Sequence, residues 1–245
     1  MKVGLAARAI CLCALFVEAF SLAAEPVSQA PPEGERALPG RHAYVVQDVL
    51  RLCQPRPGLW VDLGAGKGQV AIALLEAADN SVVMVDPKAD AMAEGLQTAR
   101  EQKGLERRLA AVVGVAESLP FPDNTVDLVV SRGSIFFWQD PVQGLREVQR
   151  VLRPGGKAYI GGGAGSGYPK SAVAQLIQGR KESMQGDEAE KWQRFVELRR
   201  PEQMSEWASR AGLTTFRVLG QGAIADDEHV GQGVWLRFEK PAPAN

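Results

Sequence analysis

Short apolar runs alternate with longer amphipathic segments along most of this chain. The runs are short, almost wholly apolar and bounded by polar residues or glycines, as buried strands are. They are Leu59–Leu63, Ser81–Asp86, Ala110–Val115, Val126–Ser131 and Ala158–Gly162. The segments with a helical period are His42–Gln54, Gln69–Ala78 and Ala89–Lys103. Strands that alternate with helices predict a parallel sheet with helices on both faces, whose ligands bind at the carboxyl ends of the strands.

The segment after the first predicted strand is the strongest candidate for a ligand site. Asp62 is followed by Gly64, Gly66 and Gly68, and then by an alanine-rich helical segment. Glycine allows positive φ and a close approach of the backbone to a ligand, and the start of a helix presents unpaired N–H groups to the same place. A nucleoside is the kind of ligand that this arrangement suits.

The spacing of the glycines argues against two phosphate-binding motifs. Gln69 stands where the last glycine of G-x-G-x-x-G belongs, so a nicotinamide dehydrogenase is disfavoured. A P-loop needs Gly and Ser or Thr where this chain has Val61 and Gly68.

A second acid, Asp86, ends the second predicted strand, roughly 20 residues past the glycines. At the tip of that strand, a carboxylate can accept both hydroxyls of a ribose. A structural alternative, compatible with the first, is that Asp86 caps a helix that begins at Pro87.

Two downstream blocks, taken with the glycine segment and Asp86, resemble a known family. The first block is Gly114–Ser131, with the sequence GVAESLPFPDNTVDLVVS, and the second is Glu147–Lys157, with the sequence EVQRVLRPGGK. The four ordered motifs resemble those of the class I S-adenosylmethionine (SAM) dependent methyltransferases, in the small-molecule branch that includes the ubiquinone and menaquinone-type methyltransferases. The likeness covers about residues 58–162 and fades after residue 165.

The resemblance implies an α/β fold, a Rossmann-like doubly wound seven-stranded sheet with an antiparallel C-terminal strand. Thr214–Leu219 and Gly233–Phe238 are then the antiparallel pair that closes the sheet. It also implies SAM as the cofactor and a small molecule as the methyl acceptor. The cofactor-binding residues that it implies are Asp62, Gly64, Ala65, Gly66, Gly68, Asp86, Pro87, Ala116, Glu117 and Ser131.

One position departs from the family's pattern. Val115 stands where the family places an Asp that accepts a hydrogen bond from the adenine amino group. Without this hydrogen bond, the binding free energy is expected to be weaker by roughly 1 kcal/mol. The backbone at Ala116 with apolar packing, or Glu117 as a substitute acceptor, are the alternatives. The departure leaves a second function open, a non-catalytic SAM-binding or scaffold protein with a degenerate methyltransferase fold.

The segment Ser131–Asp140, after the fourth predicted strand, is the candidate for acceptor recognition. It contains no N-P-P-Y-like sequence, which argues against methylation of amino groups on nucleobases or glutamine side chains. Arg132 and Trp138 are the candidate substrate residues, Arg132 because its fork of donors suits a carboxylate or phosphate. For Phe136 and Phe137, packing under the next helix is as well supported as a place in a substrate pocket or a cation–π contact with the sulfonium. Methyl transfer mainly requires alignment of donor and acceptor, so no catalytic residue is assigned.

The glycine-rich stretch Gly161–Gly167 is expected to be too flexible for a strand, and to be either the hinge of a lid made by residues 168–200 or a plain connection. Three large apolar residues of that segment are expected to pack between helices, namely Met184, Trp192 and Phe195. His229 lies in an acidic loop, where a solvated histidine is a commoner outcome than a general base. No cluster has metal-ligand spacing.

Composition indicates an ordinary globular chain. The 245 residues are 45% hydrophobic and 23% charged, enough for one large α/β domain, expected over residues 41–240. The net charge is −1 and no long Lys or Arg run is present, so no nucleic-acid partner is expected and small-molecule chemistry fits better.

The first 24 residues predict a signal peptide or leader. Two basic residues, Lys2 and Arg8, come before an uncharged apolar run, Ala9–Val17. The small residues within Ser21–Ala24 that follow are suited to cleavage by a signal peptidase. Residues 25–40, with four prolines and two glycines, predict a flexible linker. A genuine signal peptide implies a periplasmic or secreted protein, which leaves the supply of cytosolic SAM unexplained. Because Glu18 interrupts the apolar stretch, the alternative is a cytoplasmic protein, and a membrane is expected only through an uncleaved leader.

Overall fold

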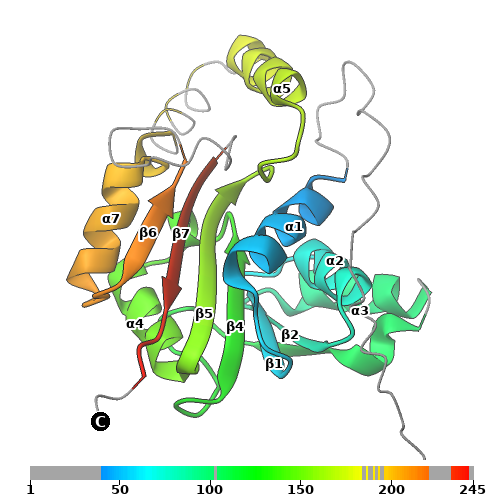
Figure 1. Cartoon of the computed structure of the whole chain (residues 1–245). Coiled ribbons are helices and arrows are strands. Elements are labelled where there is room, and N and C mark those ends of the chain that lie inside the picture. Colours follow the sequence, from blue (N-terminus) through cyan, green and yellow to red (C-terminus); the bar gives the residue numbers. More distant parts are fainter. Residues whose placement is uncertain are drawn as a thin grey trace, which may run out of the picture.

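A computed structural model describes residues 40–101, 104–183, 186, 190, 193, 196–220 and 233–242 (Figure 1). The predicted leader, residues 1–24, and the predicted linker, except Gly40, lie outside the described residues. Export and its cytoplasmic alternative therefore stay predictions. Met184, Trp192, Phe195 and His229 also lie outside this part of the chain.

Within the described residues, the sheet has seven strands in the order β3-β2-β1-β4-β5-β7-β6. Strands β1 to β5 pair in parallel, and β7 pairs antiparallel with both β5 and β6. The predicted fold class, a doubly wound seven-stranded sheet with an antiparallel C-terminal strand, is confirmed. The strands are β1 (Leu59–Leu63), β2 (Ser81–Asp86), β3 (Leu109–Val113), β4 (Val126–Arg132), β5 (Leu152–Gly163), β6 (Phe216–Leu219) and β7 (Gly233–Glu239).

Helices cover both faces of the sheet because the strands alternate their side chains between two apolar clusters. In β1, Val61 packs with α4 and α7 in one cluster, whereas Trp60 packs with α1 and α2 in the other. The α-helices are α1 (Arg41–Cys53), α2 (Gln69–Ala77), α3 (Ala89–Glu101), α4 (Pro141–Val151), α5 (Lys170–Ser183) and α7 (Pro201–Arg210). Within the described residues, none of these helices combines the length and the apolar character that crossing a bilayer requires.

Strand β5 is longer than predicted, and its glycines belong to it. The pairing with β4 shifts register near Val126, and β5 continues to Gly163 opposite β7. A Cβ on Gly161 would clash with the backbone oxygen of Val234. The expectation that this glycine run is too flexible for a strand is therefore wrong for residues 161–163. Glycine is required there because β7 approaches so closely.

Beyond β5, the chain is tied back to helix α1. The buried carboxylate of Asp48 accepts hydrogen bonds from the backbone N–H of Ser166, at 2.6 Å, and from its hydroxyl group. The rings of Tyr44 and Tyr168 pack edge to face beside this contact, 5.3 Å apart. The segment that was expected to be a hinge or a plain connection thus docks on α1 at Ser166.

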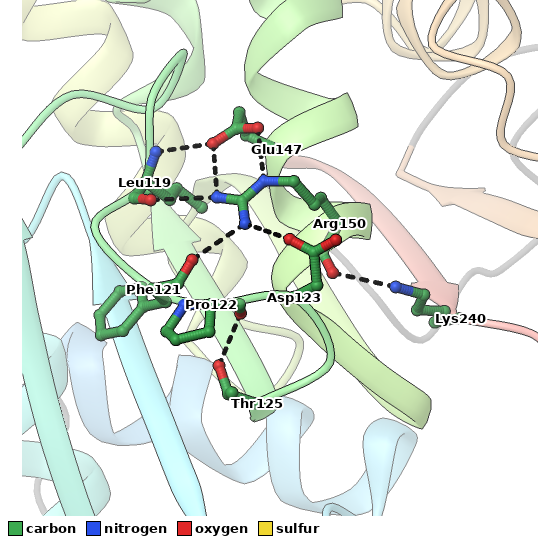
Figure 2. Close-up of polar contacts among 8 residues, drawn as sticks. All are labelled: Leu119, Phe121, Pro122, Asp123, Thr125, Glu147, Arg150 and Lys240. Carbon is green, nitrogen blue, oxygen red and sulfur yellow. Dashed lines mark hydrogen bonds and ion pairs between the residues drawn. The ribbon is translucent and has the colours of Figure 1, made fainter.

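A network centred on Arg150 joins α4 to the segment between β3 and β4 (Figure 2). Arg150 uses its Nε to bond Glu147 at 2.7 Å, one terminal nitrogen to bond Phe121 O and Asp123, and the other to bond Leu119 O and Glu147 again. Glu147 in turn accepts the N–H of Leu119 at 2.8 Å. All five guanidinium donors are used. The two sequence blocks that resemble family motifs are therefore bonded to each other.

We expect Arg150→Met to lower the free energy of unfolding by about 2–4 kcal/mol, because Glu147 loses its cationic partner and two carbonyl groups lose their donors. Hydrogen bonds from Arg150 lower the pKa of Glu147, so this stabilisation is present above the carboxyl's unfolded pKa and is lost as pH falls through its folded pKa. Urea denaturation at pH 7 measures the loss. Arg146→Met, on the same helix, removes an exposed donor to Arg210 O and is the control. Equal losses of unfolding free energy in the two variants would contradict the view that the Arg150 network, called the Arg150 clamp below, stabilises the fold.

Candidate functional site

The loop between β1 and α2 is fixed to the end of β2. Gly64 and Ala65 both donate their N–H groups to Val85 O, at 2.7 and 3.2 Å. The N–H of Gly66 donates to Asp86 Oδ2 at 2.9 Å. Three successive residues of the predicted ligand loop are therefore held by the second strand, and the two acidic strand ends are brought together.

The first two glycines of this loop have different surroundings. Both have positive φ, 71° at Gly64 and 53° at Gly66. A Cβ on Gly64 would clash with Ser134, so this glycine lets the segment after β4 pack on the tip of β1. A Cβ on Gly66 would meet nothing within 4 Å, so open space lies beside the loop there. Gly68 is the N-cap residue of α2.

Asp62 is buried and bonds to the first turn of helix α2. Its Oδ2 accepts the N–H of Ala71 at 3.0 Å. Burial raises the pKa of Asp62 to about 7, and the charge of Asp86 adds to the rise. The hydrogen bond from Ala71 and the charge of Arg132 act in the opposite direction. A cation placed at this point would favour the ionised form.

Asp86 is buried, and each of its oxygens accepts one backbone N–H. Oδ1 bonds Lys88 N at 2.8 Å and Oδ2 bonds Gly66 N. A carboxylate oxygen has two lone pairs, so each can accept one more hydrogen bond, as a pair of ribose hydroxyls would require. Helix α3 begins at Ala89, so the alternative of a helix starting at Pro87 is wrong, and Pro87 is an exposed residue of the connection.

The end of β3 supplies an apolar surface. Val115 is 45% exposed, and Ala116 next to it is buried. Glu117 turns away toward α4, where its Oε1 accepts the N–H of Asp140 at 3.0 Å. This oxygen of Glu117 is therefore engaged with the start of α4. Both alternatives for adenine, the backbone at Ala116 with apolar packing and Glu117 as an acceptor, stay predictions.

At the end of β4, a hydroxyl network binds the strand tips together. Ser134 donates to Leu63 O at 3.1 Å and lies 2.6 Å from the hydroxyl of Ser131, while Trp138 donates its Nε1–H to Ser134 at 3.0 Å. The buried Ser131 is thus engaged within the protein. Ser134 was not among the predicted site residues, since nothing in the sequence indicates that it faces Gly64.

The three aromatic residues after β4 have three different environments. Phe136 is buried and Phe137 is 74% exposed. Trp138 is half-buried, and its ring packs so closely on Gly144 that a Cβ there would lie 2.5 Å away. Packing against α4 therefore explains Trp138 at least as well as substrate binding does, and its substrate role stays a prediction.

Arg132 lies where the acidic strand ends meet a group of positive charges. Its Nε donates to Gly163 O at 2.9 Å. Burial lowers the pKa of Arg132 to about 10, assisted by the charges of Arg41 and Arg199 and opposed by Asp62. Burial, together with the charges of Arg132 and Arg41, lowers the pKa of His42 to about 3. Arg41 and Arg199 were not predicted as site residues because the fold alone brings them to Arg132.

Within the part of the chain that is described, no three His, Cys, Asp or Glu side chains are grouped so that they could hold a metal ion.

The raised pKa of Asp62 predicts a specific dependence of stability on pH. The folded pKa of about 7 exceeds the unfolded value, so the folded state binds the extra proton. The contribution of Asp62 to stability is therefore fully present below about pH 4 and is lost as pH rises through 7. Relative to Asp62→Asn, we expect the ligand-free protein to lose up to about 1.4 kcal/mol of unfolding free energy per pH unit between pH 4 and 7.

Chemical denaturation at several pH values measures this difference. Asp90→Asn, at an exposed position in α3, serves as the control and should show no such trend. A difference between the protein and Asp62→Asn that does not change with pH would refute the assignment.

Three comparisons bear on this arrangement. Residues 61–160 match the family described as a methyltransferase domain. A 2-methyl-6-phytyl-1,4-hydroquinone methyltransferase from the chloroplast of Oryza sativa subsp. japonica is 32% identical over 159 residues, which are 64% of this chain and 39% of the rice protein. The chain thus spans less than half of the length of that curated relative.

Solved structures share the fold over a larger part of the chain. A protein of Methanococcus maripaludis, assigned to the SAM-dependent methyltransferases, is similar with a TM-score of 0.69 and 25% identity, over 83% of this chain and 87% of that one. The cyclase SpnF is similar with a TM-score of 0.50 and 20% identity, over 82% of each chain, which shows the fold alone. Residues 61–160 therefore match a methyltransferase domain, and the chain shares its fold with a solved structure assigned to the SAM-dependent methyltransferases.

Proposed function

We propose that this protein transfers a methyl group from SAM to a small-molecule acceptor. The observation that carries the proposal is the pair of acidic strand ends, Asp62 and Asp86, joined by a glycine loop with open space at Gly66. A nucleoside that also carries positive charge suits two carboxylates better than a phosphate does, because a phosphate would be repelled by them. The match of residues 61–160 to a methyltransferase domain supports the same ligand.

The residues present fit SAM. Asp86 has an acceptor position left on each oxygen for the ribose hydroxyls, and the exposed Val115 offers an apolar contact for adenine. The loop at Gly66 admits the ligand without a side chain in the way. Asp62, whose pKa is raised mainly by burial, would favour the positively charged methionine end.

SAM would be held there by Asp86 at its ribose and by Asp62 near its methionine end, and it would supply an electrophilic methyl group on a cationic sulfur to the acceptor. The protein's own part is alignment. The Ser131–Ser134–Trp138 network holds the end of β4 against the tip of β1, and the Arg150 clamp holds the segment that carries Val115 and Ala116.

The rival is a SAM-binding or scaffold protein without methyl transfer. Val115 in place of an acid favours it, since one polar contact to adenine is missing. The likeness to SpnF makes the same point, because one fold serves more than one reaction. Methyl transfer and SAM binding are therefore tested separately.

We expect Asp86→Ala to weaken SAM binding about 10–100-fold, because two charge-assisted hydrogen bonds to the ribose are lost. Isothermal titration calorimetry measures the change, with Asp90→Asn, an exposed acid on α3, as the matched control. Binding of SAM that is unchanged in Asp86→Ala would reject the site.

Transfer of labelled methyl from SAM to a panel of small acceptors, including hydroquinones, decides between enzyme and rival. Label recovered in a small-molecule product that disappears in Asp86→Ala supports the enzyme. SAM binding without transfer to any member supports the rival.

A further inference from the structure

Two arginines from distant parts of the chain are anchored on consecutive carbonyl groups at the end of β5. Arg132, at the end of β4, donates its Nε–H to Gly163 O at 2.9 Å. Arg199 donates a terminal N–H to Gly162 O at 2.8 Å, and its guanidinium lies 5.5 Å from the centre of the Phe136 ring. Both side chains are partly buried at the carboxyl edge of the sheet. This edge is where ligands bind in such folds.

Among the described residues, only one of the three nitrogens of the Arg132 guanidinium has a hydrogen-bond partner. Its Nε is used by Gly163, but neither terminal nitrogen has a hydrogen bond or an ion pair with any described residue. Neither terminal nitrogen is among the buried unpaired atoms of the described residues, so both are accessible to a ligand from solvent. Arg199 and Arg41 have further contacts of their own, so the inference rests on Arg132.

The charges around Arg132 are mostly of the same sign. Arg41 and Arg199 both disfavour its protonated form, and Asp62 is the acid that opposes them. Burial, together with the charges of Arg132 and Arg41, lowers the pKa of His42. An anion placed on the free side of Arg132 would relieve this repulsion. The guanidinium fork matches the two oxygens of a carboxylate or phosphate.

Such an anion has two sources, the acceptor and the carboxylate of SAM itself. The order of the strands favours the acceptor. The nucleoside contacts are on β2 and β1, whereas Arg132 is anchored on β5, on the other side of β4. Arg132 also has two further positive charges near it, Arg41 and Arg199. The amino-acid part of SAM carries its own ammonium group beside its carboxylate, so that carboxylate needs fewer positive partners from the protein.

We propose that the terminal nitrogens of Arg132 bind a carboxylate or phosphate group of the methyl acceptor, so that the substrates of this enzyme are small anions. The inference rests on the proposed function and gives its substrate class. In this proposal, Arg132 orients the acceptor beside the cofactor. It does not take part in proton transfer, which other groups or solvent carry out.

Benzoate and benzamide are a matched pair of probes, alike in shape and different in charge. In protein saturated with S-adenosylhomocysteine, we expect calorimetry to show benzoate binding at least about tenfold more tightly than benzamide. Phenyl phosphate is expected to bind as well as benzoate does. Equal binding of benzoate and benzamide, or binding of neither, would overturn the inference. The proposed function would be untouched, because binding of S-adenosylhomocysteine reports on it separately.

Arg132→Gln should abolish the preference for benzoate, to within about twofold, and should leave the affinity for S-adenosylhomocysteine within about twofold. Arg100→Gln removes the same charge from an exposed position on α3 and is the control, with the preference retained. Arg132→Lys keeps the charge without the fork and should retain part of the preference. It also serves if Arg132→Gln fails to fold, which a thermal melt would reveal.

The cofactor's own carboxylate is the competing source. If Arg132 binds it, Arg132→Gln loses at least about tenfold in affinity for S-adenosylhomocysteine and nothing for 5′-methylthioadenosine, which lacks the amino-acid part. That result would overturn the inference and keep the SAM site. Failure of the protein to bind S-adenosylhomocysteine at all would instead remove the proposed function together with the inference.

Discussion

The attachment of the glycine loop to the end of β2 is the interaction on which the site depends. The N–H groups of Gly64, Ala65 and Gly66 all donate to Val85 O or to the Asp86 carboxylate, so the loop is fixed to the end of β2. This attachment brings two carboxylates close enough for Asp86 to raise the pKa of Asp62. The site therefore stores unfavourable electrostatics that a cationic ligand would relieve, as active sites often do.

The remainder of the fold holds the other walls of the site against this loop. The Ser134 network binds the end of β4 to Leu63 O. The Arg150 clamp bonds the segment after β3 to helix α4. On the far side of β4, the end of β5 anchors two arginines. Acidic strand ends therefore lie on one side of β4 and arginine side chains on the other, which is the basis of the proposed division between cofactor and acceptor.

The parts of the structure that depend on local chemistry were predictable from sequence. Strands β1 and β2 have the predicted bounds because each is a buried apolar run that ends at the glycine loop or at an acid. The glycines from residue 161 onward indicate flexibility when the sequence is read locally, but residues 161–163 belong to β5. Glycine is needed there because β7, about 70 residues later in the sequence, approaches β5 closely. The roles of Ser134 and Arg199 likewise arise from tertiary contacts with Leu63 and Gly162, which no local pattern reports.

The central claim is that the ends of β1, β2 and β3 converge on an adenosyl group. A crystal structure of the protein with S-adenosylhomocysteine tests it most directly. The account predicts that both ribose hydroxyls lie within hydrogen-bond distance of the Asp86 carboxylate and that adenine packs against Val115. A structure with the ligand bound elsewhere, or bound with Asp86 touching no atom of it, would contradict the account.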